Sequence, residues 1–105
     1  MISIYNLWLP TLKLRLSISD NLRDQILLDY LRIAHRNLFN NYYEIPFTVE
    51  NALIEKHIWY DDEVTKMAVI HLAVTYFSNP DENMEATNVK DDRMVIRIIG
   101  NRMVY

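Results

Sequence analysis

Three histidines and one run of acidic residues are the side chains best suited to chemistry. His35, His57 and His71 lie far apart and share no metal-ligand spacing with one another or with the acids. We interpret His71, inside an apolar segment, as a hydrogen-bonded core or interface residue. The adjacent acids 61–63 could serve acid–base catalysis or bind magnesium, but acids at a helix start more often cap it and face its dipole.

Other catalytic and binding motifs are missing from the sequence. The only glycine is Gly100, which excludes a glycine-rich phosphate loop, and no serine-nucleophile motif is present. The absence of cysteine excludes disulfides and thiolate metal sites. Tyr42, Tyr43 and Phe47 lack a basic cluster beside them, so packing is a better interpretation than base stacking. We therefore predict no enzyme activity, no catalytic residue, no cofactor and no bound metal.

Composition indicates a helical protein. The chain has 105 residues, of which half are hydrophobic, with one glycine and three prolines. So few chain-reversing residues favour helices over a many-turned β fold. The first ten residues lack the features of a signal peptide, and no apolar run is long enough for a membrane span. We expect a soluble cytosolic product without a membrane partner.

Charge is distributed unevenly along the chain. Residues 1–60 are neutral, residues 61–85 carry a net charge of −5 and residues 86–105 a net charge of +2. Such a layout is usually solvated surface, but in a self-stacking protein it could form two complementary faces.

The stretch LPTLKLRLSISD, residues 9–20, fits two structures. Apolar and polar residues alternate along it, which slightly favours a half-buried strand. A helix competes because Pro10 suits a first helical position, and Leu9, Leu12 and Leu16 then recur at spacings of three and four.

A second element is predicted as a helix from about Asn21 to Phe39. Residues 19–21 offer capping side chains, and Asp24 suits the positive end of the first turn. Asn40 and Asn41 can end the helix in a left-handed conformation. The predicted apolar stripe consists of Leu22, Ile26, Leu27, Tyr30, Leu31, Ala34 and Leu38.

A connector follows, with one short helix predicted around Val49–Lys56, and then a third helix from Val64 to Phe77. This helix is apolar on nearly all faces and is stopped by Asn79 and Pro80. At roughly 21 Å it is too short for a bilayer. A helix of this kind is normally buried between several partners, either the other helices or a neighbouring subunit. Because a chain this short has few elements with which to cover it, we expect oligomerisation.

The last segment, RMVIRIIGNRMVY, is predicted as a short helix ending at Gly100 or as a strand. The fold class is mainly α, a small helical bundle of about three to five helices with a C-terminal extension. Residues 1–83 form the predicted core, and residues 84–105 form a loop and a candidate partner-binding segment of the same single domain.

Two short motifs occur in order along the chain. The first comprises Leu9, Lys13, Leu16, Ile18 and Asp20. The second comprises Lys66, Ala68, Val69, Ile70, Leu72, Tyr76, Phe77 and Asn79. Together they resemble the phage head–tail connector (adaptor) family, whose members form a ring beneath the portal, and the resemblance covers about residues 9–80. The chain departs from the family at Asn79-Pro80-Asp81 and lacks an obvious proline-led C-terminal helix.

The resemblance implies a structural protein of the virion neck, made in the host bacterial cytoplasm. It implies a helix over Leu9–Leu16 and a homo-oligomeric ring of about twelve small helical subunits. Such a ring docks on the portal protein, extends the DNA channel without sequence-specific DNA binding, and presents a surface for the stopper or tail-completion protein.

Family members commonly reach onto the portal with a terminal segment. The resemblance therefore makes Arg93, Arg97, Arg102 and Tyr105 the candidate portal-binding residues, although a last core element with solvated arginines is an equally good interpretation. An alternative function is a small helical regulator or nucleic-acid-binding module, for which Arg32 and Arg36 are the only helical candidates.

Overall fold

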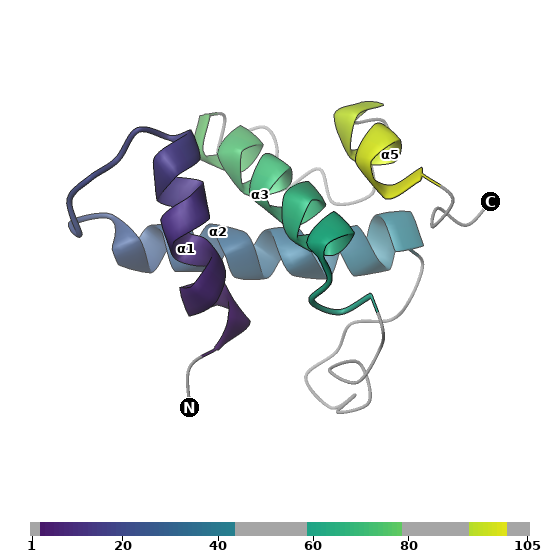
Figure 1. The fold of residues 1–105 in the computed structure, drawn as a ribbon, viewed down its shortest axis with the longest axis horizontal. Helices are drawn as coiled ribbons and strands as arrows, with labels where there is room; N and C mark the ends of the chain where they lie inside the picture. Colours follow the sequence, from purple (N-terminus) through teal and green to yellow (C-terminus); the bar gives the residue numbers. More distant parts are fainter. Residues whose placement is uncertain (1–2, 44–58, 79–92, 101–105) are drawn as a thin grey trace.

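The computed structural model describes residues 3–43, 59–78 and 93–100. These residues form helix α1 (Ile4–Arg15), α2 (Asp24–Asn37), a π-helical continuation η1 (Leu38–Tyr43), α3 (Glu63–Ser78) and α5 (Arg93–Ile99). Helices α1 and α3 pack on α2 and on each other, and α5 packs on α3 (Figure 1). The described residues contain no strand. The predicted small, mainly α bundle is confirmed.

Helix α1 replaces the strand that the alternating pattern slightly favoured. It begins at Ile4 behind the N-cap Ser3, so Pro10 lies inside the helix and not at its first position, as the helical alternative had assumed. Leu9 and Leu12 are buried, whereas Leu14 is 80% exposed. The helix expected over Leu9–Leu16 is confirmed, with Leu16 as its C-cap residue. The alternating pattern was misleading because the buried residues follow helical spacing, while the alternation continues onto the solvent face.

The end of α1 is a Schellman motif. The Ile18 N–H donates to the Lys13 carbonyl at 2.9 Å, and the Ser17 N–H donates to the Leu14 carbonyl at 3.2 Å. Ser17 occupies the left-handed position with φ 57°. Glycine is the usual residue there because a Cβ atom makes this conformation costly.

Helix α2 begins at Asp24, later than predicted, and residues 19–21 do not cap it. Arg23 occupies the N-cap position without a side-chain hydrogen bond to the helix. Leu22 and Ile26 are 92% and 46% exposed, which corrects their assignment to the buried stripe. Leu22 precedes the helix, so helical spacing does not apply to it. The other five predicted stripe residues are buried.

The predicted end of α2 at Asn40 and Asn41 is also wrong. The helix continues as η1 through Tyr43, and Ser17 is the only non-glycine residue in the described part of the chain with positive φ. The wider π turn coincides with burial of two consecutive pairs of residues, Leu38–Phe39 and Tyr42–Tyr43. Burial of these four apolar side chains accounts for the continuation past two asparagines. The predicted short helix around Val49–Lys56 lies outside the described residues.

Helix α3 confirms the predicted central helix. The Asp62 carboxylate accepts a hydrogen bond from the Thr65 N–H at 3.0 Å, which is the expected cap. Helices α1, α2 and α5 all contact α3, so the predicted burial between several partners is confirmed. These partners belong to the same chain, and Met67 is the one large apolar side chain of α3 that is more than half exposed. Burial of α3 therefore does not by itself require a second subunit.

The last described element is a helix, not a strand. Val95 and Ile99 are buried in the common core, and Gly100, with φ 58°, follows the helix. None of the described helices combines the length and apolarity needed to cross a membrane.

Candidate functional site

The predicted portal-binding residues fall partly on α5. Arg93 and Arg97 are exposed, and their spacing of four places them on one face of the helix. Neither has an ion-pair partner among the described residues. The other face of α5 is buried against α3, so the helix combines a core face with two solvated arginines. Arg102 and Tyr105 lie outside the described residues.

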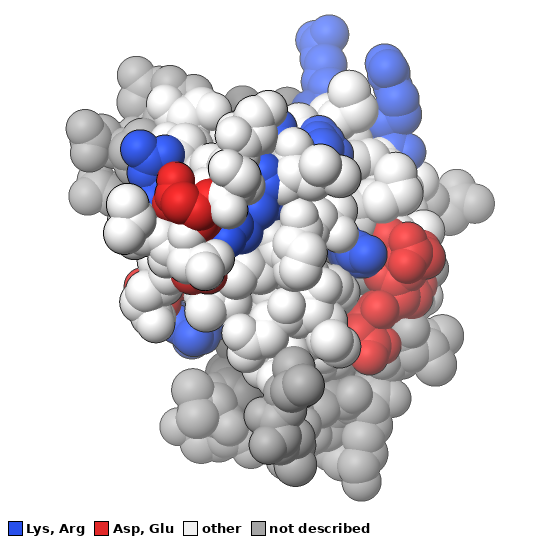
Figure 2. Space-filling model, turned by 60° about the vertical axis from the view of Figure 1, so that its left-hand side comes forward, with Lys and Arg blue, Asp and Glu red and all other residues white. Residues whose placement is uncertain are grey.

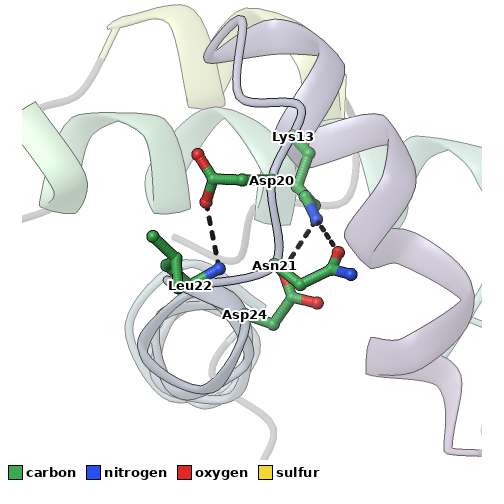
Figure 3. A network of polar contacts seen from close by, with 5 residues as sticks. All are labelled: Lys13, Asp20, Asn21, Leu22 and Asp24. Carbon is green, nitrogen blue, oxygen red and sulfur yellow. Dashed lines mark hydrogen bonds and ion pairs between the residues drawn. The ribbon is translucent and has the colours of Figure 1, made fainter.

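The first motif organises the turn between α1 and α2. Lys13 donates from Nζ to Asp24 Oδ1 at 2.8 Å and to Asn21 Oδ1 at 2.9 Å, while Asp20 Oδ1 accepts from the Leu22 N–H at 3.0 Å (Figure 3). Three further motif residues pack in or against the core: Leu9, Leu16 and Ile18. The polar residues of this motif therefore hold the α1–α2 turn.

The second motif forms the packed faces of α3. Ala68, Val69, Ile70, Leu72 and Tyr76 are buried, and Lys66 and Phe77 are half-buried. The Tyr76 hydroxyl accepts a hydrogen bond from Asn37 Nδ2 at 2.9 Å. The Phe77 ring meets Tyr30 edge to face at 6.4 Å between centroids and lies 5.9 Å from the Arg23 guanidinium. Asn79 lies outside the described residues.

A buried histidine joins three segments of the bundle. His35 of α2 has no solvent exposure, and its Nε2 lies 2.8 Å from the Tyr60 carbonyl oxygen. Its Nδ1 lies 2.9 Å from the Tyr5 hydroxyl of α1. A carbonyl oxygen can only accept, so Nε2 carries the proton and Nδ1 accepts from the Tyr5 O–H. Burial lowers the pKa of His35 to about 4, although the Tyr60 hydrogen bond opposes this shift.

Four aromatic rings of the described residues pack around the His35 ring. Tyr60, Phe39, Trp8 and Tyr5 lie at centroid distances of 4.7, 5.2, 5.4 and 5.6 Å. Burial, with a further contribution from Tyr60, raises the pKa of the Tyr5 hydroxyl. Both side chains of the Tyr5–His35 pair are thus held in their neutral forms.

The sequence prediction missed this centre, although one signal was available. His35 follows Leu31 by four residues and precedes Leu38 by three, which places it on the buried face of α2. Its partners are distant in sequence, and nothing in the sequence pattern identified them. His71 is half-buried, and its carbonyl accepts a hydrogen bond from Thr75 Oγ1 at 3.1 Å. His57 lies outside the described residues.

The described residues contain no group of three or more His, Cys, Asp or Glu side chains that could hold a metal ion. Every buried side-chain nitrogen and oxygen atom among them has a hydrogen-bond partner. The polar contacts described above join helices and turns, which is an architectural role.

The two arginines considered for nucleic-acid binding differ in their contacts within the protein. Arg32 pairs with Asp29 at 2.9 Å and its guanidinium lies 5.9 Å from the Tyr5 ring, whereas Arg36 is exposed. On the face shown in Figure 2, basic side chains are separated by uncharged and acidic surface. This face does not present the continuous basic patch that is typical of a duplex-binding surface.

Comparison with known proteins identified no relative. No family model matches the chain, and searches of curated proteins and of solved structures found no match.

Proposed function

We propose that this protein is a structural subunit of a phage head–tail connector ring. The observation that carries the proposal is the placement of the two motifs that resemble the connector family. One forms α1 with its turn and the other forms α3, and these helices pack on each other and on α2. Motif residues from both segments therefore take part in one packed unit.

In this proposal about twelve copies form a ring that docks on the portal and extends the DNA channel in the virion neck. The chain is made in the host bacterial cytoplasm, and the ring presents a surface to the stopper or tail-completion protein. DNA passes without sequence-specific contacts, because strong phosphate contacts hold DNA in place.

We propose α5 and the residues that follow it as the portal-binding face. Arg93 and Arg97 are exposed and without ion-pair partners among the described residues, so their charges are available to an acidic surface. Arg102 and Tyr105, which lie outside the described residues, are proposed to bind the portal as well. We propose no catalytic role, cofactor or metal.

Affinity capture tests the proposal. The tagged chain is co-expressed with the portal protein of the same genome, and the portal is expected to co-purify at moderate salt. The double substitution Arg93→Glu with Arg97→Glu is expected to reduce the captured portal at least tenfold. Arg15→Glu, which changes an exposed arginine of α1, is the matched control and is expected to retain capture. A wild-type chain that captures no portal contradicts the proposed function, and equal capture by both variants contradicts the assignment to α5.

A further inference from the structure

His35 is the point at which α1, α2 and the segment before α3 are joined. Tyr5 and Trp8 approach its ring from α1, Phe39 approaches from η1, and Tyr60 lies just ahead of α3. Removal of α1 from the bundle takes away both the Tyr5 hydroxyl and the Trp8 ring, so the imidazole loses one hydrogen-bond partner and one of the rings packed against it.

The two hydrogen bonds of this centre require a neutral imidazole. The Tyr60 carbonyl accepts from Nε2, and the Tyr5 hydroxyl donates to Nδ1. Protonation of Nδ1 places two donors face to face, so the Tyr5 hydroxyl must turn its hydrogen elsewhere. The protonated ring then carries a charge in a site without solvent exposure.

The described groups that contact the His35 ring are uncharged in their usual forms. Among the described residues, the titratable groups that lie against the ring are the hydroxyls of Tyr5 and Tyr60, and the other two ring neighbours, Trp8 and Phe39, are uncharged. Burial therefore opposes a positive charge on the imidazole.

We propose that His35 is a proton-sensitive latch that holds α1 in the bundle, and that acidification releases α1 before the remaining helices separate. This inference does not depend on the proposed connector function.

Helix α1 is the element suited to leave first. Only three of its residues are buried, and Pro10 inside it lacks the N–H that a helix residue donates to the carbonyl four positions earlier. Helices α2 and α3 share the most extensive packing in the described part of the chain.

The size of the effect follows from proton linkage. The pKa of His35 is about 4 in the closed bundle and returns toward its ordinary value of 6.5 when the ring is exposed. The released state then binds more protons between these values, so the opening constant of α1 rises roughly 30-fold between pH 7.5 and pH 5.

Amide hydrogen exchange of the full chain measures this opening directly. After correction for intrinsic exchange rates, the opening constants of α1 amides are expected to rise roughly 30-fold between pH 7.5 and pH 5. At both pH values they are expected to exceed those of buried α3 amides. Opening constants for α1 that do not change with pH overturn the latch, and identical constants in α1 and α3 overturn the early release of α1.

Two variants identify the responsible group. His35→Gln retains a donor for the Tyr60 carbonyl but does not titrate. In this variant the opening constants of α1 amides are therefore expected not to rise between pH 7.5 and pH 5. Tyr5→Phe removes the donor that favours neutral His35, which raises the pKa of His35 and makes the increase smaller than in the wild type. If His35→Gln does not fold, the test rests on Tyr5→Phe. In that variant, a rise of the α1 opening constants between pH 7.5 and pH 5 that equals or exceeds the wild-type rise overturns the proposal.

Discussion

Lys13 and Asp24 form an ion pair at 2.8 Å that joins the last turn of α1 to the first turn of α2 (Figure 3). The Lys13 side chain is 13% exposed and the Asp24 side chain 32% exposed, whereas Arg32 and Asp29 form a pair with 51% and 44% exposure. The described residues thus contain one sheltered ion pair and one solvated pair of similar length. Lys13 also belongs to the motif that resembles the connector family.

Asp24→Asn is expected to destabilise the fold by roughly 1 kcal/mol, because it leaves the ammonium of a mostly buried lysine side chain with a weaker acceptor. Asp29→Asn is the matched control and is expected to change the free energy of unfolding by less than about 0.5 kcal/mol. Urea unfolding of both variants checks this difference. Equal effects of the two substitutions contradict a structural role for the sheltered pair.

Ser17→Gly is expected to stabilise the protein by about 0.5 kcal/mol. Glycine removes the cost of a Cβ atom in the left-handed conformation, and the greater freedom of the unfolded chain offsets part of the gain. Ser19→Gly, in the same turn but without positive φ, is the control and is expected to be slightly destabilising. The thermal midpoints of the two variants should therefore move in opposite directions.

Tyr76→Phe is expected to cost roughly 1–3 kcal/mol, because the amide of Asn37, itself 7% exposed, loses its acceptor. A double-mutant cycle with Asn37→Leu separates this loss from general packing effects. The double variant is expected to be less destabilised than the sum of the two single variants. Strict additivity argues against a coupled pair.

Stability is expected to fall as the pH decreases from about 6.5 to about 4. The pKa of His35 is about 4 in the folded protein and 6.5 in the unfolded chain, so the unfolded state binds more protons in this window. The stabilisation from the neutral, buried ring is complete above pH 6.5 and amounts to roughly 3 kcal/mol. Urea midpoints between pH 7.5 and pH 4 measure this loss, and His35→Gln should show a flatter dependence. If the urea midpoint of His35→Gln depends on pH as steeply as that of the wild type, His35 is not the cause of the stability loss.

The sequence predicted α3 well because the helix has an explicit start signal and no internal breaker. Asp62 caps it as expected, and uniform apolarity correctly indicated contact with several helices. The start of α2 was misplaced because capping side chains at residues 19–21 are used differently: Asp20 and Asn21 act in the turn with Leu22 and Lys13. A capping residue type does not specify which backbone group it bonds.

The alternating pattern of α1 and the role of His35 could not be resolved from local sequence. In α1 the strand and helix patterns share several leucines, and packing against α2 and α3 decides between them. His35 depends on partners 30 and 25 residues away, Tyr5 and Tyr60. The helical spacing of His35 from buried leucines indicates that it lies inside the fold. Its hydrogen-bond partners, however, are set by the tertiary structure.

Native mass spectrometry of the chain mixed with the portal ring of the same genome tests the connector proposal most directly. The proposal predicts a complex that exceeds the mass of the portal ring by about twelve copies of this 12.6 kDa chain. A portal ring of unchanged mass beside a strictly monomeric chain contradicts it.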